Sequence, residues 1–154
     1  MISDKIITSP EGFILKPFWY YLISFTWGLS VTLVGYVVAG FLLLCGFEAK
    51  KNVYGWYFEI GTNWGGADFG MICLVNKNPS RHLLNHEFGH SIQNCIFGPL
   101  TWFFVMIPSV LRYWLRIFWD KNIDIKLPPY DYAWFEQQAS MFGDRYYARV
   151  CGED

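Results

Sequence analysis

Residues 20–45 read YYLISFTWGLSVTLVGYVVAGFLLLC, and this run decides the fold class that the sequence predicts. No Asp, Glu, Lys or Arg lies between Lys16 and Glu48. A bilayer core of about 30 Å needs roughly 20 helical residues, so the run is long enough for one transmembrane helix with length left for tilt. It is also longer, and begins later, than the apolar region of a cleaved signal peptide. We therefore expect residues 1–48 to form an N-terminal segment with a permanent transmembrane anchor, and residues 49–154 to form a second domain.

The composition of the whole chain agrees with contact to lipid. Of 154 residues, 53% are apolar, 21% are aromatic and only 16% are charged, whereas about 25% of the residues of a soluble domain are charged. Such a chain is too apolar to be intrinsically disordered. The formal net charge of −1 gives no electrostatic reason to expect nucleic acid as a partner. The four cysteines have no C-x-x-C spacing, so we expect scattered buried thiols. They are Cys45, Cys73, Cys95 and Cys151.

Basic residues on the two sides of the apolar run give its expected orientation. Lys5 and Lys16 precede the run, and a slightly larger set follows it, which is Lys50, Lys51, Lys77 and Arg81. Because basic residues concentrate on the cytoplasmic side of a membrane, we expect an integral protein of the cell membrane with most of the chain in the cytoplasm. The lipid bilayer is then an expected partner.

After the run, the pattern changes to that of a small α+β domain that is mainly helical. The Gly-rich turn at residues 64–66 predicts a β-hairpin over Tyr57 to Leu74. A helix is expected over residues 80–97, with Pro79 at its first position and Gly98 and Pro99 after its end. Residues 100–111 are free of charge but cover only about 18 Å as a helix, so an interfacial or re-entrant helix kinked at Pro108 is expected. A loop (residues 121–129) and a last helix (residues 130–150) follow.

The central helix carries the motif with the most specific chemistry, His86-Glu87-Phe88-Gly89-His90, which is an H-E-x-x-H pattern. Two histidines four residues apart lie about 40° apart around a helix and one turn above each other, so both rings can bind one metal ion. Glu87 lies about 100° round from His86, where its carboxylate can hold a water. This spacing predicts His86 and His90 as metal ligands and Glu87 as the catalytic general base.

A catalytic zinc needs a third protein ligand, and the last helix offers Glu136 in the stretch WFEQQASMFGD. Ala139, Ser140 and Gly143 follow at helical spacing and are all small, so this face can approach another helix closely. Asp144 is the rival ligand, although a solvated surface charge is the simpler role for either carboxylate.

Other polar residues near the motif have weaker claims to a role. His82 stands one turn before His86 and is a conceivable ligand, but it fits an ordinary histidine near the helix start better. Asn85, Gln93 and Asn94 are expected to be polar helix-face residues and not catalysts. No tyrosine can be singled out as an oxyanion donor among Tyr130, Tyr132, Tyr146 and Tyr147.

The sequence HEFGH, followed about 45 residues later by a helical E-x-x-A, resembles the gluzincin class of zinc metallopeptidases. It is similar in particular to the small membrane-bound peptidases of the prenyl-protein endopeptidase and heat-shock membrane protease types. The resemblance implies one catalytic Zn²⁺ held by His86, His90 and Glu136, with Glu87 as base. It also implies that an edge strand within residues 57–74 binds extended substrate by strand addition.

The chain departs from that class at Ser140, because those peptidases usually have an Asp directly after the Ala. Asp144, one turn further on, is a candidate for the missing contact to a zinc-bound histidine. Site-2-type intramembrane proteases share the H-E-x-x-H pattern but need a distant Asp in a membrane helix. Asp124 and Asp131 stand in polar or Pro-rich sequence, so that family is the second choice.

The sequence thus predicts a membrane-anchored zinc metalloendopeptidase that hydrolyses peptide bonds in a peptide or membrane-protein substrate near the membrane surface. One alternative is a non-catalytic, zinc-stabilised membrane interaction protein. Another is a membrane subunit of a larger assembly that has no activity of its own.

Overall fold

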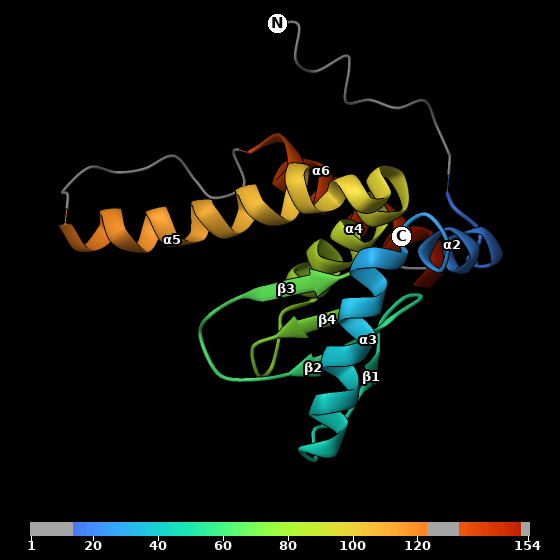
Figure 1. Cartoon of the computed structure of the whole chain (residues 1–154), viewed down its shortest axis with the longest axis horizontal. Helices are drawn as coiled ribbons and strands as arrows, with labels where there is room; N and C mark the ends of the chain where they lie inside the picture. Colours follow the sequence, from blue (N-terminus) through green and yellow to red (C-terminus); the bar gives the residue numbers. More distant parts are fainter. Residues whose placement is uncertain (1–13, 123–132, 152–154) are drawn as a thin grey trace, which may run out of the picture.

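The computed structural model describes residues 14–122 and 133–151 and is mainly helical, with one small sheet (Figure 1). Its helices are α2 (Pro17–Ser24), α3 (Leu29–Leu44), α4 (Arg81–Phe97), α5 (Ile107–Asn122) and α6 (Trp134–Cys151). A 3-10 turn, η1 (Gly98–Leu100), and a π-helical turn, η2 (Trp102–Met106), join α4 to α5. The strands are β1 (Lys50–Lys51), β2 (Trp56–Glu59), β3 (Gly66–Phe69) and β4 (Ile72–Val75). The expected α+β class with a majority of helix is therefore confirmed.

The prediction of one continuous helix through the apolar run is wrong, because the run is broken into α2 and α3, which meet at 89°. A side chain of α4 contacts the chain at the break. Asn94 Nδ2 donates to the carbonyl oxygen of Gly28 at 3.2 Å and to Thr32 Oγ1 at 3.3 Å. A Cβ atom on Gly28 would lie 2.6 Å from Asn94 Nδ2, so a side chain at this position would displace the amide of Asn94. The side chain of Asn94 thus joins α4 to the start of α3.

Among the described residues, no single helix is both long and apolar enough to cross a bilayer. Two bent pairs reach that length and composition together. They are α2 with α3, and Arg81–Leu100 with Trp102–Trp119, which meet at 118°. The second bend falls near residue 101 and not at the expected Pro108, which lies in the first turn of α5.

The predicted hairpin over Tyr57 to Leu74 is also wrong in its pairing. The strand order is β1-β2-β4-β3, so β2 and β3 are not neighbours, and β2 pairs with β4 in parallel. The hairpin is β3–β4, closed by Gly70 and Met71. Gly70 has φ of +73°, which favours glycine, and its N–H donates to Asp68 Oδ2 at 2.9 Å. The Gly-rich turn at residues 64–66 instead leads from β2 to β3, which lie on opposite sides of β4.

Helix α4 begins one residue later than expected, because Ser80 is its N-cap and accepts a hydrogen bond from the Leu83 N–H at 3.1 Å. Pro79 therefore precedes the cap and is not the first helical residue. Helix α4 ends at Phe97 before Gly98, as expected. In the described part of the chain, α6 starts at Trp134, and residues 123–132, which include most of the predicted loop, lie outside the described residues.

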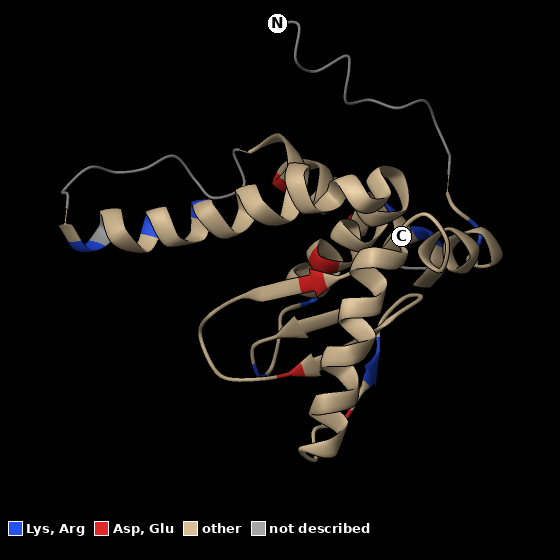
Figure 2. Cartoon of the chain, in the orientation of Figure 1, with Lys and Arg blue, Asp and Glu red and all other residues tan. Residues whose placement is uncertain are grey.

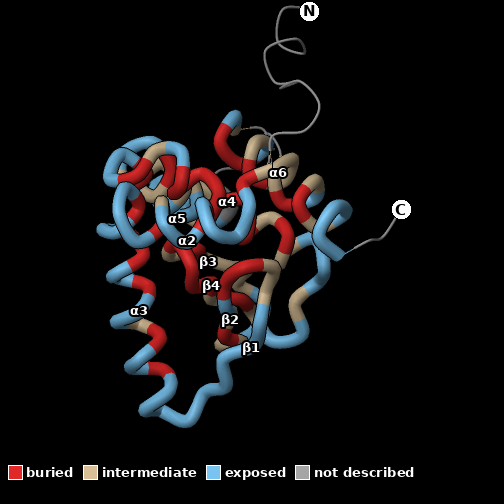
Figure 3. Tube along the Cα trace, turned by 90° about the vertical axis from the view of Figure 1, so that its right-hand side faces the viewer, coloured by how far each residue is buried: buried red, intermediate tan, exposed pale blue. Residues whose placement is uncertain are grey.

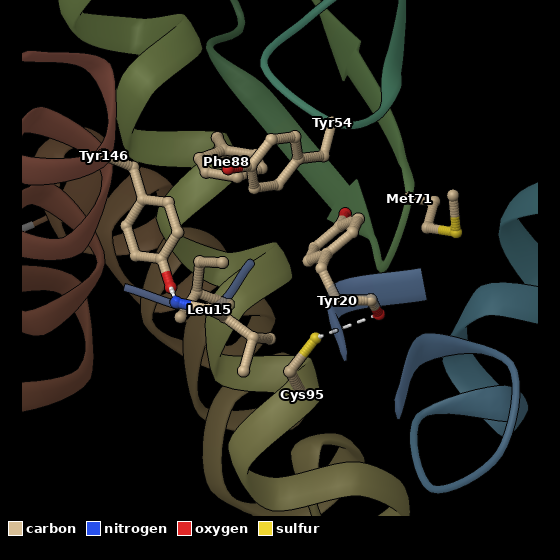
Figure 4. Packing of buried hydrophobic residues seen from close by; sticks show 8 residues of the cluster. Leu15, Tyr20, Tyr54, Met71, Phe88, Cys95 and Tyr146 are labelled. Carbon is tan, nitrogen blue, oxygen red and sulfur yellow. Dashed lines mark hydrogen bonds between the residues drawn. The ribbon is translucent and has the colours of Figure 1, made fainter. Parts of the chain in front are cut away.

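The elements pack in layers that place α4 at the centre. Figure 3 shows α3 and α5 on one side, α4 and the sheet in the middle, and α6 on the other side. The larger core cluster joins α2, the sheet, α4 and α6 (Figure 4), and its members are Leu15, Tyr20, Tyr54, Met71, Phe88, Ile92, Cys95 and Tyr146. A smaller cluster fixes α3 on the sheet through Ala39, Leu42, Phe58 and Ile72. The apolar run is therefore packed against the rest of the fold along one face.

The four thiols are free. Cys73 and Cys95 are buried as expected, whereas Cys45 and Cys151 are exposed, which corrects the expectation that all four are buried. Buried Cys95 lies 3.4 Å from Ser24 Oγ, where α2 meets α4.

Candidate metal centre

Helices α4 and α6 cross with almost no space between their backbones, because glycine stands at both points of contact. A Cβ atom on Gly89 would overlap the carbonyl oxygen of Ala139, and one on Gly143 would overlap the carbonyl oxygen of Asn85. The small residues of the E-x-x-A stretch and the glycine of HEFGH thus serve the same crossing. This crossing brings the two parts of the predicted metal site together.

His86, His90 and Glu136 meet at the crossing. His86 Nε2 lies 3.0 Å from Glu136 Oε2, His90 Nε2 lies 3.2 Å from the same oxygen, and the two Nε2 atoms are 3.2 Å apart. Glu136 is fully buried, with 0% of its side chain exposed, while the two histidine side chains keep 12% and 11%. The structure therefore gathers all three predicted ligands into one nearly equilateral triangle of ligand atoms.

Gln93 determines which nitrogen of His90 carries the proton. Gln93 Nε2 donates to the carbonyl oxygen of Phe135 at 2.7 Å and to Gln138 Oε1 at 3.0 Å. Gln93 Oε1 consequently faces His90 Nδ1, at 2.8 Å. An amide oxygen can only accept, so His90 Nδ1 is the donor, and in the neutral ring Nε2 has a lone pair. His90 Nε2 faces the carboxylate of Glu136, and the contact is favourable only with a positive charge between the two atoms, either a proton on Nε2 or a metal ion that replaces it.

Two serines support the other ligands. Ser140 Oγ lies 2.9 Å from His86 Nδ1, so it makes the contact that the resemblance assigns to an Asp. Ser109 Oγ, from α5, donates to Glu136 Oε1 at 2.9 Å, which leaves Oε2 directed at the two histidines. Each of the three ligands therefore has its own neutral hydrogen-bonding partner, an arrangement that orients metal ligands in proteins.

Sequence reasoning missed Gln93 and Ser109. Gln93 was expected on a polar helix face, yet it is fully buried, and its position three residues after His90 was the available signal. Ser109 has no such signal, because it comes from a different helix whose local pattern is apolar.

Charges in the cluster favour an ionised Glu136. Burial alone would raise its pKa, but hydrogen bonds from His86 and His90 outweigh burial and hold the pKa well below its usual range. For His90, burial disfavours the charged ring, yet the hydrogen bond to Glu136 and the charge of Glu87 raise the pKa to about 9. The cluster thus attracts positive charge strongly, as a cation site must.

Glu87 lies beside the cluster and against the sheet. It is buried, and a Cβ atom on Gly66 of β3 would overlap Glu87 Oε1, so the strand passes directly over the carboxylate. Burial raises the pKa of Glu87, and the two histidines partly oppose the shift. A carboxyl with a raised pKa exchanges a proton more readily near neutral pH, which is the property of a general acid–base group.

The rival residues lie elsewhere. Asp144 accepts a hydrogen bond from Asn85 Nδ2 at 3.0 Å and is not in the cluster, so it neither replaces Glu136 nor contacts a ligand histidine in the described hydrogen bonds. His82 is exposed and also outside the cluster. Tyr146 belongs to the core, where it accepts from the Leu15 N–H, and Tyr147 lies under the guanidinium of Arg81. Tyr130, Tyr132, Asp124 and Asp131 fall outside the described residues.

The donor set fits a zinc ion. Zn–N bonds of about 2.0–2.1 Å in a tetrahedral site place the ligand atoms roughly 3.3–3.4 Å apart. The three ligand atoms here are 3.0–3.2 Å apart, so a small outward shift accommodates the ion. Two imidazoles and one carboxylate also form a ligand set typical of catalytic zinc, with a fourth position left for water.

In comparisons with known proteins, no family model matches the chain, and no curated protein and no solved structure matches it either.

Proposed function

We propose that this protein is a membrane-associated zinc metalloendopeptidase of the gluzincin type. The observation that carries the proposal is the buried triangle of His86 Nε2, His90 Nε2 and Glu136 Oε2, in which Gln93 accepts from His90 Nδ1 and so leaves Nε2 directed at the carboxylate. Such an arrangement is costly unless a proton or a metal ion lies between the groups. The H-E-x-x-H spacing then assigns a proton-transfer role to Glu87.

The roles of the residues follow from their positions. His86, His90 and Glu136 would hold the ion, and the bound zinc would supply Lewis-acid chemistry toward water and a peptide carbonyl. Glu87 takes the proton of the attacking water and later gives it to the leaving amine, which a carboxyl with a raised pKa does well. Ser140 and Gln93 keep the imidazoles in the orientation that leaves both Nε2 atoms available.

Strand β3 is the proposed binding element for an extended peptide. It is at the edge of the sheet, paired only with β4 on its other side, and Gly66 brings its backbone next to Glu87. An unpaired edge offers backbone N–H and C=O groups that an extended peptide can pair with. This agrees with a substrate that is a peptide or an extended segment of a membrane protein.

Association with a membrane is supported by the exposed apolar surface. Large apolar side chains are exposed on α2, α3, η2 and α5, and the segment from Pro17 to Phe47 has no charged residue. Extensive exposed apolar surface marks contact with a membrane or with another protein. We propose that the bilayer covers it, with the metal centre on the cytoplasmic side of the cell membrane.

The test uses detergent-purified full-length protein, with zinc content measured by elemental analysis and cleavage of a peptide library followed by mass spectrometry. We expect one zinc per chain and new peptide termini. Glu87→Gln should abolish cleavage while the zinc content stays the same. Asp144→Asn is the matched carboxylate control and should leave both unchanged.

Two outcomes would overturn the proposal. Absence of zinc after reconstitution would exclude the metal centre. A stoichiometric zinc with no Glu87-dependent cleavage would favour the non-catalytic, zinc-stabilised alternative.

A further inference from the structure

Helix α3 is apolar on both of its faces, but only one face is covered by protein. Gly35 packs directly on the backbone of Phe69, and Ala39 and Leu42 pack on the sheet. On the opposite side, exposed residues follow each other at helical spacing, with 68% of Val37 and 89% of Leu44 exposed. The exposed stripe consists of Leu33, Val37, Phe41 and Leu44. A helix that packs on a sheet along its length is not surrounded by lipid.

The length of α3 leads to the same conclusion. Its 16 residues extend about 24 Å at 1.5 Å per residue, which is less than the roughly 30 Å of a bilayer core. The turn at residues 25–28 then sends the chain away at 89°. Helix α3 therefore fits along or into one leaflet better than across two.

Helix α5 has a second apolar face, directed away from the metal centre. Ser109 points inward, toward Glu136. Counting 100° per residue, the exposed residues Ile107, Leu111 and Phe118 lie about 160–180° from Ser109 around the helix. Trp114, of which 63% is exposed, lies about 140° away. The outer side of α5 is thus as apolar as that of α3.

The two arginines of α5 lie away from this outer side, whereas Lys121, in the last turn, lies about 120° from Ser109 at the end of the outer side. Arg112 and Arg116 come three and seven residues after Ser109, which places both on the inward half of the helix. An apolar aromatic face opposite a basic face is the pattern of helices that lie in the plane of a membrane. In Figure 2, α3 carries no charged residue at all, whereas α5 has basic positions along its length.

The two outer faces belong to the same side of the molecule. In Figure 1, α3 and α5 lie in front of α4, the sheet and α6. In Figure 3, which is turned by 90°, α3 and α5 lie together on one side. Their directions differ strongly in Figure 1, so together they define a surface and not a single rod.

We infer that the outer sides of α3 and α5 form one lipid-binding face that enters a single leaflet of a bilayer, with neither helix crossing the membrane. This rests on the proposed membrane association but not on the metal or on catalysis. The occupant is the acyl-chain layer, because the exposed stripes of α3 and α5 are apolar and include aromatic side chains, while Lys121 lies at the end of the face, where anionic headgroups are. The metal centre, on the inward side of α5, then stays outside the acyl-chain layer.

The topology is tested with two cysteines that flank the apolar run, Lys16→Cys and Glu48→Cys, both at exposed positions. They are introduced together into full-length protein in which Cys45→Ser and Cys151→Ser remove the exposed native thiols. The protein is reconstituted in sealed vesicles of phosphatidylcholine with one-third phosphatidylglycerol and treated with a membrane-impermeant maleimide polymer. A one-sided face gives molecules with two polymers or none, since both cysteines are on the same side. A spanning helix gives molecules with one polymer, whatever the mixture of orientations.

Vesicle flotation separates lipid from the other possible occupant, a second copy of the chain. We expect the wild type to float. The double variant Val37→Asp, Trp114→Asp should bind vesicles at least about tenfold more weakly. Val150→Asp, at an exposed apolar position on α6, is the matched control and should float like the wild type. Singly modified molecules, or a dimer that does not float, would each overturn the inference. Zinc content and Glu87-dependent cleavage, measured in detergent, report separately on the proposed function.

Discussion

The candidate metal centre and the proposed lipid-binding face differ in where their polar and apolar residues lie. In α4, the buried residues include Asn85, Glu87, Gln93 and Asn94, whereas the exposed residues of α3 include Val37 and Leu44. In the first region, Asn85, Gln93 and Asn94 are buried and donate to neighbouring elements, and the second region exposes apolar side chains. Hydropathy alone would place α3 in the core and α4 at the surface. Side-chain hydrogen bonds to neighbouring elements, and not hydrophobicity alone, therefore accompany the central position of α4, although Asn85 Oδ1 and Asn94 Oδ1 have no hydrogen-bond partner among the described residues.

The largest expected effect is the loss of the metal from the polar region. Glu136→Ala removes the only carboxylate of the cluster and leaves two neutral imidazoles, so zinc affinity should fall by roughly three orders of magnitude. Competition with a fluorescent chelator measures the affinity. Asp144→Ala changes a carboxylate on the same helix and should keep full affinity. Equal losses in the two variants would contradict the assignment of the third ligand.

The next effect concerns the stability of the helix crossing. Gly89→Ala forces a methyl group into the backbone of Ala139 and should lower the free energy of unfolding by about 3 kcal/mol or more. Gly40→Ala is the control on the lipid-binding face, where a Cβ atom meets nothing within 4 Å. This change should raise stability by about 0.5–1 kcal/mol, because alanine is the better helix former. Thermal unfolding in detergent compares the two, and a tolerated Gly89→Ala would show that the helices are further apart than described.

A smaller effect is expected at the support of His90. Gln93→Leu keeps the volume but removes the acceptor at His90 Nδ1, so zinc affinity should fall about 10- to 100-fold. Gln93→Glu keeps an acceptor and should retain more affinity than Gln93→Leu. The same chelator competition measures both variants. If leucine and glutamate behave alike, Gln93 acts only through packing.

The smallest effect sharpens the link between the two regions. Ser109 belongs to α5, yet its hydroxyl orients Glu136. Ser109→Ala should weaken zinc binding by a few-fold to about tenfold, because the other ligands are unchanged. Vesicle flotation should not change, since the apolar side of α5 is opposite. A change in flotation without a change in zinc affinity would show that Ser109 does not support the metal ligands and would contradict the prediction.

The three residues of the candidate site could be predicted from the sequence, because the pattern within each of the two helices is local. The i, i+4 histidines and the small residues after Glu136 both follow helical periodicity, so the crossing of α4 and α6 could be anticipated. Hydropathy was misleading for the apolar run, where Ser24, Thr26 and Gly28 interrupt it without lowering its average much. The break depends on Asn94, which is more than 60 residues away in the chain. No local pattern could indicate that partner.

The strand pairing was mispredicted for a similar reason. Two glycine signals compete, and the turn forms at the single Gly70, where Asp68 accepts from the backbone, and not at the paired glycines. The parallel pairing of β2 with β4 is a non-local choice that turn residues do not encode. Ser109 was missed at the site for the same reason, because its contact with Glu136 is also non-local. It belongs to a segment that was interpreted only by its hydrophobicity.

The separation of the ligands along the chain also determines when the centre can form. His90 is 46 residues before Glu136, and η1, η2 and α5 are made in between. During synthesis, α4 therefore emerges as a helix with two histidines and a base but no third ligand. Only after α5 has been made and α6 has docked is the ligand set complete. If the proposed function holds, a growing chain cannot assemble the zinc centre before its apolar helices have been produced, so the order of synthesis itself would delay the activity until the proposed lipid-binding face exists.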